Sequence, residues 1–397
     1  MLRTYKNISG KIIIIFLMIV TSFSSSVCQT SVKSDEEGQD IWGKISPAFM
    51  PPSEFKDKYG DYRSPLKFYD GKQVNTPREW KKRRTEILDR WNGMMGKWPR
   101  LIKNQKLEIV DTTKKEGYIQ YRVKFKWLPD QVTEGYLLIP DGTGKRPAVI
   151  TVYYEPETAI GIGPENRDFA LQLTKRGFVT LSIGTKETTN SKTHSLYYPD
   201  IKNSKIQPLS LLAYAAANAW YVVSKLPEVD PENIGITGHS YGGKWSMFAS
   251  CLFEKFACAA WSDPGIVFDE SRPNVNYWEP WYLGYYPPPW DNTWRKNGLT
   301  AGAKGLYPKL VEEGYDLQEL HALMAPRPFL VSGGSEDTPN RWIPLNHSIA
   351  VNKLLGYENR VAMTNRPDHS PTLESNEYIY LFFEYFLKNK GARKARY

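Results

Sequence analysis

The sequence predicts a three-layer α/β fold with a mostly parallel central sheet. From residue 146 to the C-terminus, short apolar runs alternate with helical patterns, and two extended segments precede them. Strands that alternate with helices form a parallel sheet with helices on both faces. A Gly-x-Ser-x-Gly string at 238–242 stands where one apolar run meets a helix. Because such sheets carry their sites at the carboxyl ends of the strands, we expect the functional residues at that edge.

The first predicted elements are a helix and a pair of strands. The helix begins at residue 77, because Thr76 suits the cap position, Pro77 the first turn and Glu79 completes a capping box. The segments 116–127 and 132–140 alternate between apolar and polar residues, which predicts two neighbouring strands.

The remaining elements follow from apolar runs and helical periodicity. Strands are predicted at 146–154, 178–184, 232–240, 256–265, 327–334 and 359–365. Helices are predicted at 169–177, 208–226, 241–253, 346–356 and 375–390.

The N-terminus is typical of a secretory signal peptide. Arg3, Lys6 and Lys11 form a basic region before the short apolar stretch 12–20, which is too short to span a bilayer core of about 30 Å. Cys28 is a possible lipid-anchor acceptor, although Val precedes it where a small residue is usual. We therefore expect an exported protein, periplasmic or at the bacterial cell surface, without an integral membrane span.

We expect the rest of the chain to divide into an N-terminal extension at 29–75 and the α/β domain at 76–397, with an aromatic-rich insert at about 264–320. The formal net charge is +9, and removing the three cations of the signal leaves about +6. An exported basic protein meets acidic polysaccharides more often than nucleic acid, although the excess also fits scattered solubilising charge. Cys251 and Cys258 fit buried thiols better than a bridge. No metal site or cofactor is expected, since no His or Cys cluster has ligand spacing.

Ser240 is the candidate nucleophile. The stretch "IGITGHSYGGKW" runs from a strand through a tight turn into a helix, and Gly238 and Gly242 leave room for close backbone contacts. This is the nucleophile elbow of the α/β-hydrolase fold, which holds the serine in a strained and accessible position. A serine hydroxyl also needs a base to remove its proton.

The candidate base is His369. The α/β-hydrolase order is nucleophile, acid, histidine, and His369 lies in the loop "TNRPDHSPT" after the last predicted strand. His239 lies inside the elbow itself, and His347 falls within a helical pattern.

Three residues compete for the acid. The loop after the strand at 327–334 offers Asp337 and Glu336, and Asp337 has the better spacing. Asp263 follows the preceding strand and reaches the same histidine in some enzymes, although an Asp before Pro also forms turns. The oxyanion would be bound by the backbone N–H of Tyr241 and a second donor near Tyr153 or Tyr154.

Much of the chain, from about residue 75 to 385, resembles the bacterial carbohydrate esterases of the α/β-hydrolase superfamily, especially the glucuronoyl esterase group. The resemblance rests on "REWKKRRTEIL", "GHSYGGKW", "FEKFACAAWSDPG" and "LHALMAPRPFLV". It implies that Lys244 binds sugar hydroxyls and that an acid at the position of Asp263 serves the triad. The chain has Tyr241 where that group usually has Arg, and "RPDHSP" where its histidine loop is usually Gly-rich. Pectin methylesterases and acetyl esterases of this fold are equally near.

The insert is rich in aromatic residues. Trp278, Trp281, Trp290 and Trp294 lie among tyrosines and prolines, as a satellite packing cluster or as a wall that stacks on sugar rings. Arg272, Lys244 and Arg341 are candidate cations for a uronate carboxylate, each equally compatible with plain surface charge.

Taken together, these patterns predict an exported serine esterase that removes methyl or other esters of sugar carboxylates from a plant or algal polysaccharide such as pectin. The alternatives are an acetyl xylan esterase, a serine peptidase of the same fold and a non-catalytic carbohydrate-binding protein. About 100 to 150 N-terminal residues are too few for the large extra domain that such peptidases usually carry.

Overall fold

The computed structural model describes residues 36, 38–185, 196–200, 203–269, 306–389 and 391–393. The chain divides into two units, Met1–Pro47 and Ala48–Tyr397. In the first unit, residues 38–45 are helical. The second unit contains the central sheet, and residues 48–75 belong to it. Among the helices of these described ranges, none is both long and apolar enough to cross a membrane.

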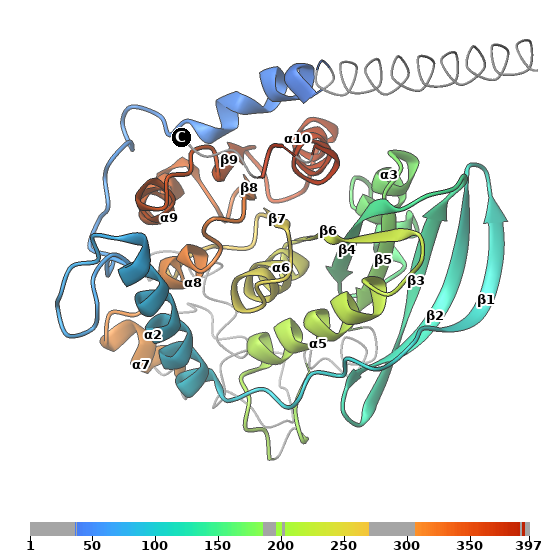
Figure 1. Ribbon diagram of the computed structural model, residues 1–397, viewed down its shortest axis with the longest axis horizontal. Helices are drawn as coiled ribbons and strands as arrows, with labels where there is room; N and C mark the ends of the chain where they lie inside the picture. Colours follow the sequence, from blue (N-terminus) through green and yellow to red (C-terminus); the bar gives the residue numbers. More distant parts are fainter. Residues whose placement is uncertain are drawn as a thin grey trace, which may run out of the picture. The chain divides into compact units, whose positions relative to one another are not determined.

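The predicted fold class is confirmed. The described residues form one nine-stranded sheet in the order β1-β2-β3-β5-β4-β6-β7-β8-β9 (Figure 1). The strand pairs β1–β2, β2–β3 and β3–β5 are antiparallel. The pairs β5–β4, β4–β6, β6–β7, β7–β8 and β8–β9 are parallel. The strands are β1 Glu108–Lys115, β2 Tyr118–Leu128, β3 Gln131–Pro140, β4 Arg146–Tyr153, β5 Val179–Gly184, β6 Val229–His239, β7 Cys258–Ser262, β8 Phe329–Gly333 and β9 Val361–Asn365.

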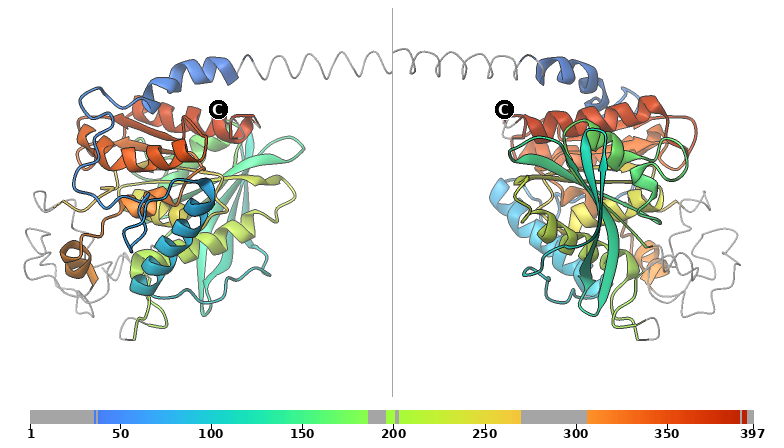
Figure 2. Two further views of the ribbon diagram at one scale, coloured as in Figure 1. Left: turned by 60° about the vertical axis from the view of Figure 1, so that its left-hand side comes forward. Right: turned by 90° about the vertical axis from the view of Figure 1, so that its right-hand side faces the viewer.

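Helices cover both faces of the sheet (Figures 1 and 2). On one face, α5 packs on α6 and β2, and α8 lies against α6 and α9; on the other, α3 packs on β5 and α10 on β8. The helices are α2 Pro77–Met95, α3 Phe169–Lys175, α5 Pro208–Val223, α6 Tyr241–Leu252, α7 Leu306–Glu312, α8 Gln318–Ala322, α9 Trp342–Leu354 and α10 Leu373–Phe383, which continues as a π-helical turn at Glu384–Lys388.

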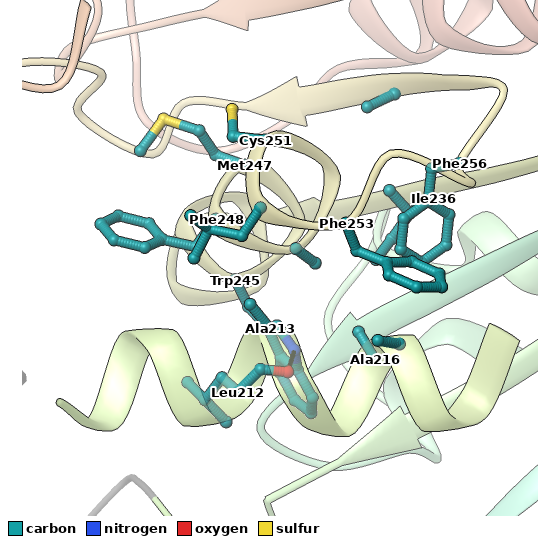
Figure 3. Packing of buried hydrophobic residues seen from close by; sticks show 14 of the residues in the cluster. Leu212, Ala213, Ala216, Ile236, Trp245, Met247, Phe248, Cys251, Phe253 and Phe256 are labelled. Atoms are coloured by element: carbon teal, nitrogen blue, oxygen red, sulfur yellow. Dashed lines mark hydrogen bonds between the residues drawn. The ribbon is translucent and has the colours of Figure 1, made fainter. Parts of the chain in front are cut away.

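The core beneath the elbow is the contact between α5 and α6 (Figure 3). Ala213 and Ala216 of α5 are fully buried, and their small side chains allow α6 to approach closely. Trp245 of α6 fills the space between the two helices and donates its indole N–H to Leu212 O at 2.6 Å. This packing fixes the helix that starts directly after Ser240.

The structure adds β1, α7 and α8 to the predicted elements, and it confirms two local predictions. Strand β1 has no counterpart among the predicted strands, because its residues are polar and mostly exposed, as an edge strand allows. Cys251 and Cys258 are buried free thiols, as predicted. Helix α2 has the predicted capping box at Thr76 and Glu79.

Candidate active site

Ser240 lies on a strained turn between β6 and α6. Its φ and ψ are 57° and −116°, a conformation that a non-glycine residue adopts only when its surroundings enforce it. A Cβ at Gly238 would lie 2.5 Å from Val152 O, and one at Gly242 would lie 1.9 Å from the same oxygen. Only glycine fits at both positions, so the Gly-x-Ser-x-Gly spacing follows from how closely this turn packs on β4.

The elbow, the histidine loop and the end of β7 together form a hydrogen-bonded relay. Ser240 Oγ lies 2.8 Å from His369 Nε2, and His369 Nδ1 lies 2.7 Å from Asp263 Oδ2. Asp263 is fully buried, whereas the His369 side chain is 35 % exposed. A nucleophile bonded to a base that is itself oriented by a buried carboxylate is the arrangement needed for acyl transfer.

Asp263 occupies the acid position that the sequence analysis assigned first to Asp337. The Asp263 carboxylate also accepts the backbone N–H groups of Gly334 at 2.7 Å and Asp337 at 2.8 Å. Glu336 adds a longer contact from its own N–H at 3.2 Å. The loop that was expected to supply the acid therefore supplies the amides that hold the acid.

Asp337 does not bond to His369 and instead binds the loop that follows Asp263. Its carboxylate accepts the backbone N–H groups of Gly265 at 2.8 Å and Ile266 at 2.7 Å. Burial, and then the nearby charge of Asp263, raise the pKa of Asp337 to about 6 against the opposing effect of Arg341. The two aspartates thus bind each other's loops, and only Asp263 reaches the base.

Glu336, the other alternative, also makes no bond to His369. Its carboxylate accepts the hydroxyl of the adjacent Ser335 at 3.2 Å.

Arg366 holds the histidine loop, and the sequence analysis did not identify it. Its guanidinium donates to the carbonyl oxygens of His369 at 2.6 Å, Ser370 at 2.8 Å and Ser332 at 2.8 Å. The only signal in the sequence was its place three residues before the candidate base. Because Arg366 ties that loop to the end of β8, it holds the His369 imidazole in place between Ser240 and Asp263.

His239 packs beside the candidate base. Its ring centroid lies 4.7 Å from that of His369, and its Nδ1 lies 3.1 Å from Ser262 Oγ. Burial, and then the proximity of His369, hold the pKa of His239 well below its usual value. A neutral ring therefore lies against the imidazole of the candidate base.

Comparison with solved structures agrees with this architecture. The chain is similar to a glucuronoyl esterase from Solibacter usitatus, with a TM-score of 0.65 and 16% identity over 86% of this chain and 100% of that one. It is also similar to a Bacteroides fragilis protein assigned as an acetyl xylan esterase, with a TM-score of 0.51 and 16% identity over 80% of this chain and 86% of that one. A methylesterase matches with a TM-score of 0.50 and 15% identity over 90% of this chain and 70% of that one. The chain has the α/β-hydrolase fold. No protein-family model and no curated protein sequence matches it.

In this fold, the two residues predicted for the oxyanion site lie at the starts of the segments that follow β6 and β4. Tyr241 is the first residue of α6, and Tyr154 directly follows β4. Their rings stack 4.3 Å apart at 7°, and the Tyr241 hydroxyl lies 3.1 Å from Thr185 Oγ1. Since the Tyr241 side chain is fully buried, only its backbone is positioned to serve an oxyanion.

Two predicted substrate-binding cations are internal in the α/β-hydrolase structure. Lys244 is 1% exposed and donates its Nζ to Gly265 O, and burial lowers its pKa to about 8. Arg341 pairs with Asp269 at 2.8 Å and lies 3.9 Å from Asp337. The chain position after the elbow favoured a sugar contact for Lys244, but the folded loop 263–268 covers it. Both residues therefore brace the loop that follows Asp263.

The other predicted substrate-binding residues, Arg272, Trp278 and Trp281, lie outside the described residues, as do Trp290 and Trp294. Cys28 and the predicted signal peptide also lie outside them.

Proposed function

We propose that this chain is a serine esterase that hydrolyses ester groups carried by a polysaccharide. The observation that carries the proposal is the relay from Ser240 through His369 to Asp263, with contacts of 2.8 and 2.7 Å. Such a relay is suited to forming and clearing an acyl-enzyme. The similarity of the fold to carbohydrate esterases supports the substrate class.

The reaction proceeds in two halves. His369 Nε2 accepts the proton of Ser240 Oγ as that oxygen attacks the ester carbonyl, and Asp263 stabilises the imidazolium that forms. The backbone N–H groups of Tyr241 and Tyr154 bind the oxyanion, a role in which one donor is worth about 3–4 kcal/mol. The imidazolium then protonates the leaving alcohol. Water, activated by the same imidazole, releases the acid from Ser240.

For the substrate, we propose a methyl or other ester of a sugar carboxylate on an acidic polysaccharide such as pectin. The net charge of about +6 that remains without residues 1–28 supports an anionic polymer, and likeness to a glucuronoyl esterase and a methylesterase supports the ester class. The second candidate is an acetyl ester on a neutral xylan. The burial of Lys244 and Arg341 favours this alternative, because it removes two of the cations expected beside a uronate.

We further propose that residues 1–28 direct export and that the enzyme acts in the periplasm or at the cell surface. The basic start and the short apolar stretch 12–20 support this proposal. Expression of the full chain in a bacterial host, followed by fractionation and N-terminal sequencing, tests it. A mature N-terminus at or near Cys28 is expected. An intact Met1 in the cytoplasmic fraction would contradict it.

The test of function compares the wild-type protein with Ser240→Ala on p-nitrophenyl acetate, methylated pectin, acetylated xylan and a dipeptide amide. The esters are expected to be cleaved and the amide left intact, and Ser240→Ala should lower kcat by about five to six powers of ten. Methanol released from pectin and acetate released from xylan distinguish the two substrate candidates. A folded Ser240→Ala protein that keeps a tenth of the activity would exclude Ser240 as the nucleophile.

A further inference from the structure

A cavity of about 700 Å³ opens beside the candidate active site, on the side of β3 and β5. Its walls come from β2, β3, the end of β5 and the segment that follows β4, and none of the three relay residues lines it. Its volume falls within the range of about 300–1,000 Å³ that is usual for ligand sites. The relay does not account for this cavity.

The cavity lies at the same edge of the sheet as the nucleophile. Thr185, which follows β5 and lines the cavity, contacts the hydroxyl of Tyr241, the residue after Ser240. A Cβ at Gly184 would lie 2.6 Å from Tyr154 O, so the glycine lets the segment after β4, which carries the oxyanion candidate Tyr154, pass close to the end of β5. In the sheet order, β3 lies three strands from β6, which is about 14 Å at about 4.8 Å per strand. Figure 1 shows these neighbouring strands.

The cavity wall offers charged groups of both signs. Glu134 of β3 pairs with Lys124 at 3.0 Å and Arg122 at 3.6 Å, both on β2. The hydroxyl of Tyr136 donates to Glu157 at 3.4 Å. Two cations and two acids leave no formal net charge, so the wall lacks the cation excess that a phosphate site needs. Donors and acceptors in balance suit a ligand with many hydroxyl groups.

Trp127 and Gln131 complete the wall. Trp127 lines the cavity and is 6% exposed, and its indole Nε1 is buried away from solvent. The residue therefore offers the cavity part of its ring and not its N–H group. Gln131 also lines the cavity and contributes an amide, which both donates and accepts hydrogen bonds.

We propose that this cavity is a sugar-binding subsite, which holds units of the substrate polymer next to the sugar that carries the ester. The inference rests on the proposed esterase function and extends it. An ester-bearing sugar at Ser240 and a neighbouring part of the same polymer at β3 span the distance of about 14 Å. A small aryl ester bound at Ser240 does not reach the cavity. The subsite therefore contributes to binding of polymers and not of small esters.

The test removes one cation and one acid from the cavity wall, so the net charge does not change. The double variant Lys124→Ala/Glu134→Ala is compared with Lys114→Ala/Asp141→Ala, which removes another surface pair of the same β-hairpin region outside the cavity. We expect the first variant to lower kcat/KM on acetylated xylo-oligosaccharides or methylated oligogalacturonides by about tenfold. Its kcat/KM on p-nitrophenyl acetate should not change. The control should match the wild type on all substrates.

A second measurement tests binding without hydrolysis. The same two double variants are made in the Ser240→Ala background, in which an ester is bound but not turned over. Calorimetric titration with the same oligosaccharides should show weaker binding for Lys124→Ala/Glu134→Ala only, and Lys114→Ala/Asp141→Ala should bind like the Ser240→Ala parent.

These outcomes separate the two proposals. If the wild-type protein hydrolysed none of the esters, or if Ser240→Ala hydrolysed them equally well, the esterase function would be overturned. The titration would still decide whether the cavity binds sugar. Equal losses on oligosaccharide and aryl esters, or unchanged oligosaccharide turnover and affinity in the cavity variants, would overturn the subsite and leave the esterase function intact.

Discussion

Replacing Asp263 by Asn should almost abolish turnover, because the surroundings dictate how the new amide lies. Oδ1 of Asp263 accepts N–H groups from Gly334 at 2.7 Å and Asp337 at 2.8 Å, while Oδ2 faces His369. The oxygen of an asparagine must face the backbone donors, since its NH₂ group would repel them. The NH₂ group is then directed at His369 Nδ1. That nitrogen must become the acceptor, which leaves the proton on Nε2, facing Ser240.

The magnitude follows from the tautomer. An imidazole protonated at Nε2 cannot accept the proton of Ser240 Oγ, and the same Asp-to-Asn change in the serine protease triad lowers kcat about 10⁴-fold. Four powers of ten correspond to about 5.4 kcal/mol of activation free energy. The asparagine keeps the backbone bonds through its oxygen, so the loss should appear in kcat far more than in folding.

Asp337→Asn is the matched control, because Asp337 is equally buried and also accepts two backbone amides. It loses one of those bonds, which costs about 1–3 kcal/mol of stability, and should lower kcat less than tenfold. The assay is kcat on p-nitrophenyl acetate, with thermal unfolding to verify the fold. If Asp263→Asn retained a tenth of the wild-type kcat, or Asp337→Asn were the more damaging change, the assignment of the acid would be refuted.

Three further predictions follow from the loops around the relay and from the charge. Arg366→Lys should lower kcat tenfold or more, whereas Arg327→Lys, whose buried guanidinium also binds backbone carbonyls but away from the relay, should affect only the melting temperature. The pKa of Lys244 is about 8 in the folded protein and 10.5 in the unfolded chain, so between these two pH values the folded wild type binds fewer protons and its free energy of unfolding should rise with pH, by up to roughly 3 kcal/mol. Lys244→Met should abolish this rise, which urea unfolding at about pH 7.5 and about pH 10 measures. Activity on a partly methylated polyuronate should fall steeply between 0.1 M and 1 M salt, where the Debye length shrinks from about 10 to about 3 Å; salt-independent preference for acetylated xylan would favour the acetyl esterase.

Local sequence signals were sufficient for the parallel strands, for most of the helices and for the elbow. The capping box at Thr76, the apolar runs of the parallel strands and the two elbow glycines each depend on neighbours in sequence, so their patterns are visible without the fold. Strand β1 was missed for the opposite reason. Its exposed polar residues pair only with β2, and such an edge strand has no apolar periodicity.

The cations were misplaced because burial depends on chain segments that are distant in sequence. Lys244 follows the elbow directly, which suggested a substrate contact, but its Nζ is covered by the segment around Gly265 and lies near the charges of Asp337 and Asp316. Arg366 was overlooked for the same reason. Its partners lie on β8 and in the histidine loop, and nothing in "RPDHSP" marks an arginine that binds four backbone carbonyls.

The choice between the two aspartates could not be made from spacing. Asp263 and Asp337 both follow parallel strands that are direct neighbours, with Ser262 opposite Ser332, so both carboxylates emerge at the same edge. Each then accepts backbone N–H groups from the other's loop, which makes their local surroundings nearly symmetrical. The two differ in their backbone and in their contact with the base: Asp263 has a positive φ of 46°, and its Oδ2 lies 2.7 Å from His369 Nδ1. Exchanging the two roles would require Asp337 to leave both of its amide donors at Gly265 and Ile266 unsatisfied in a buried loop. Which acid serves His369 therefore depends on hydrogen bonds between loops that are distant in sequence, and these contacts leave no signature in the spacing of the two aspartates.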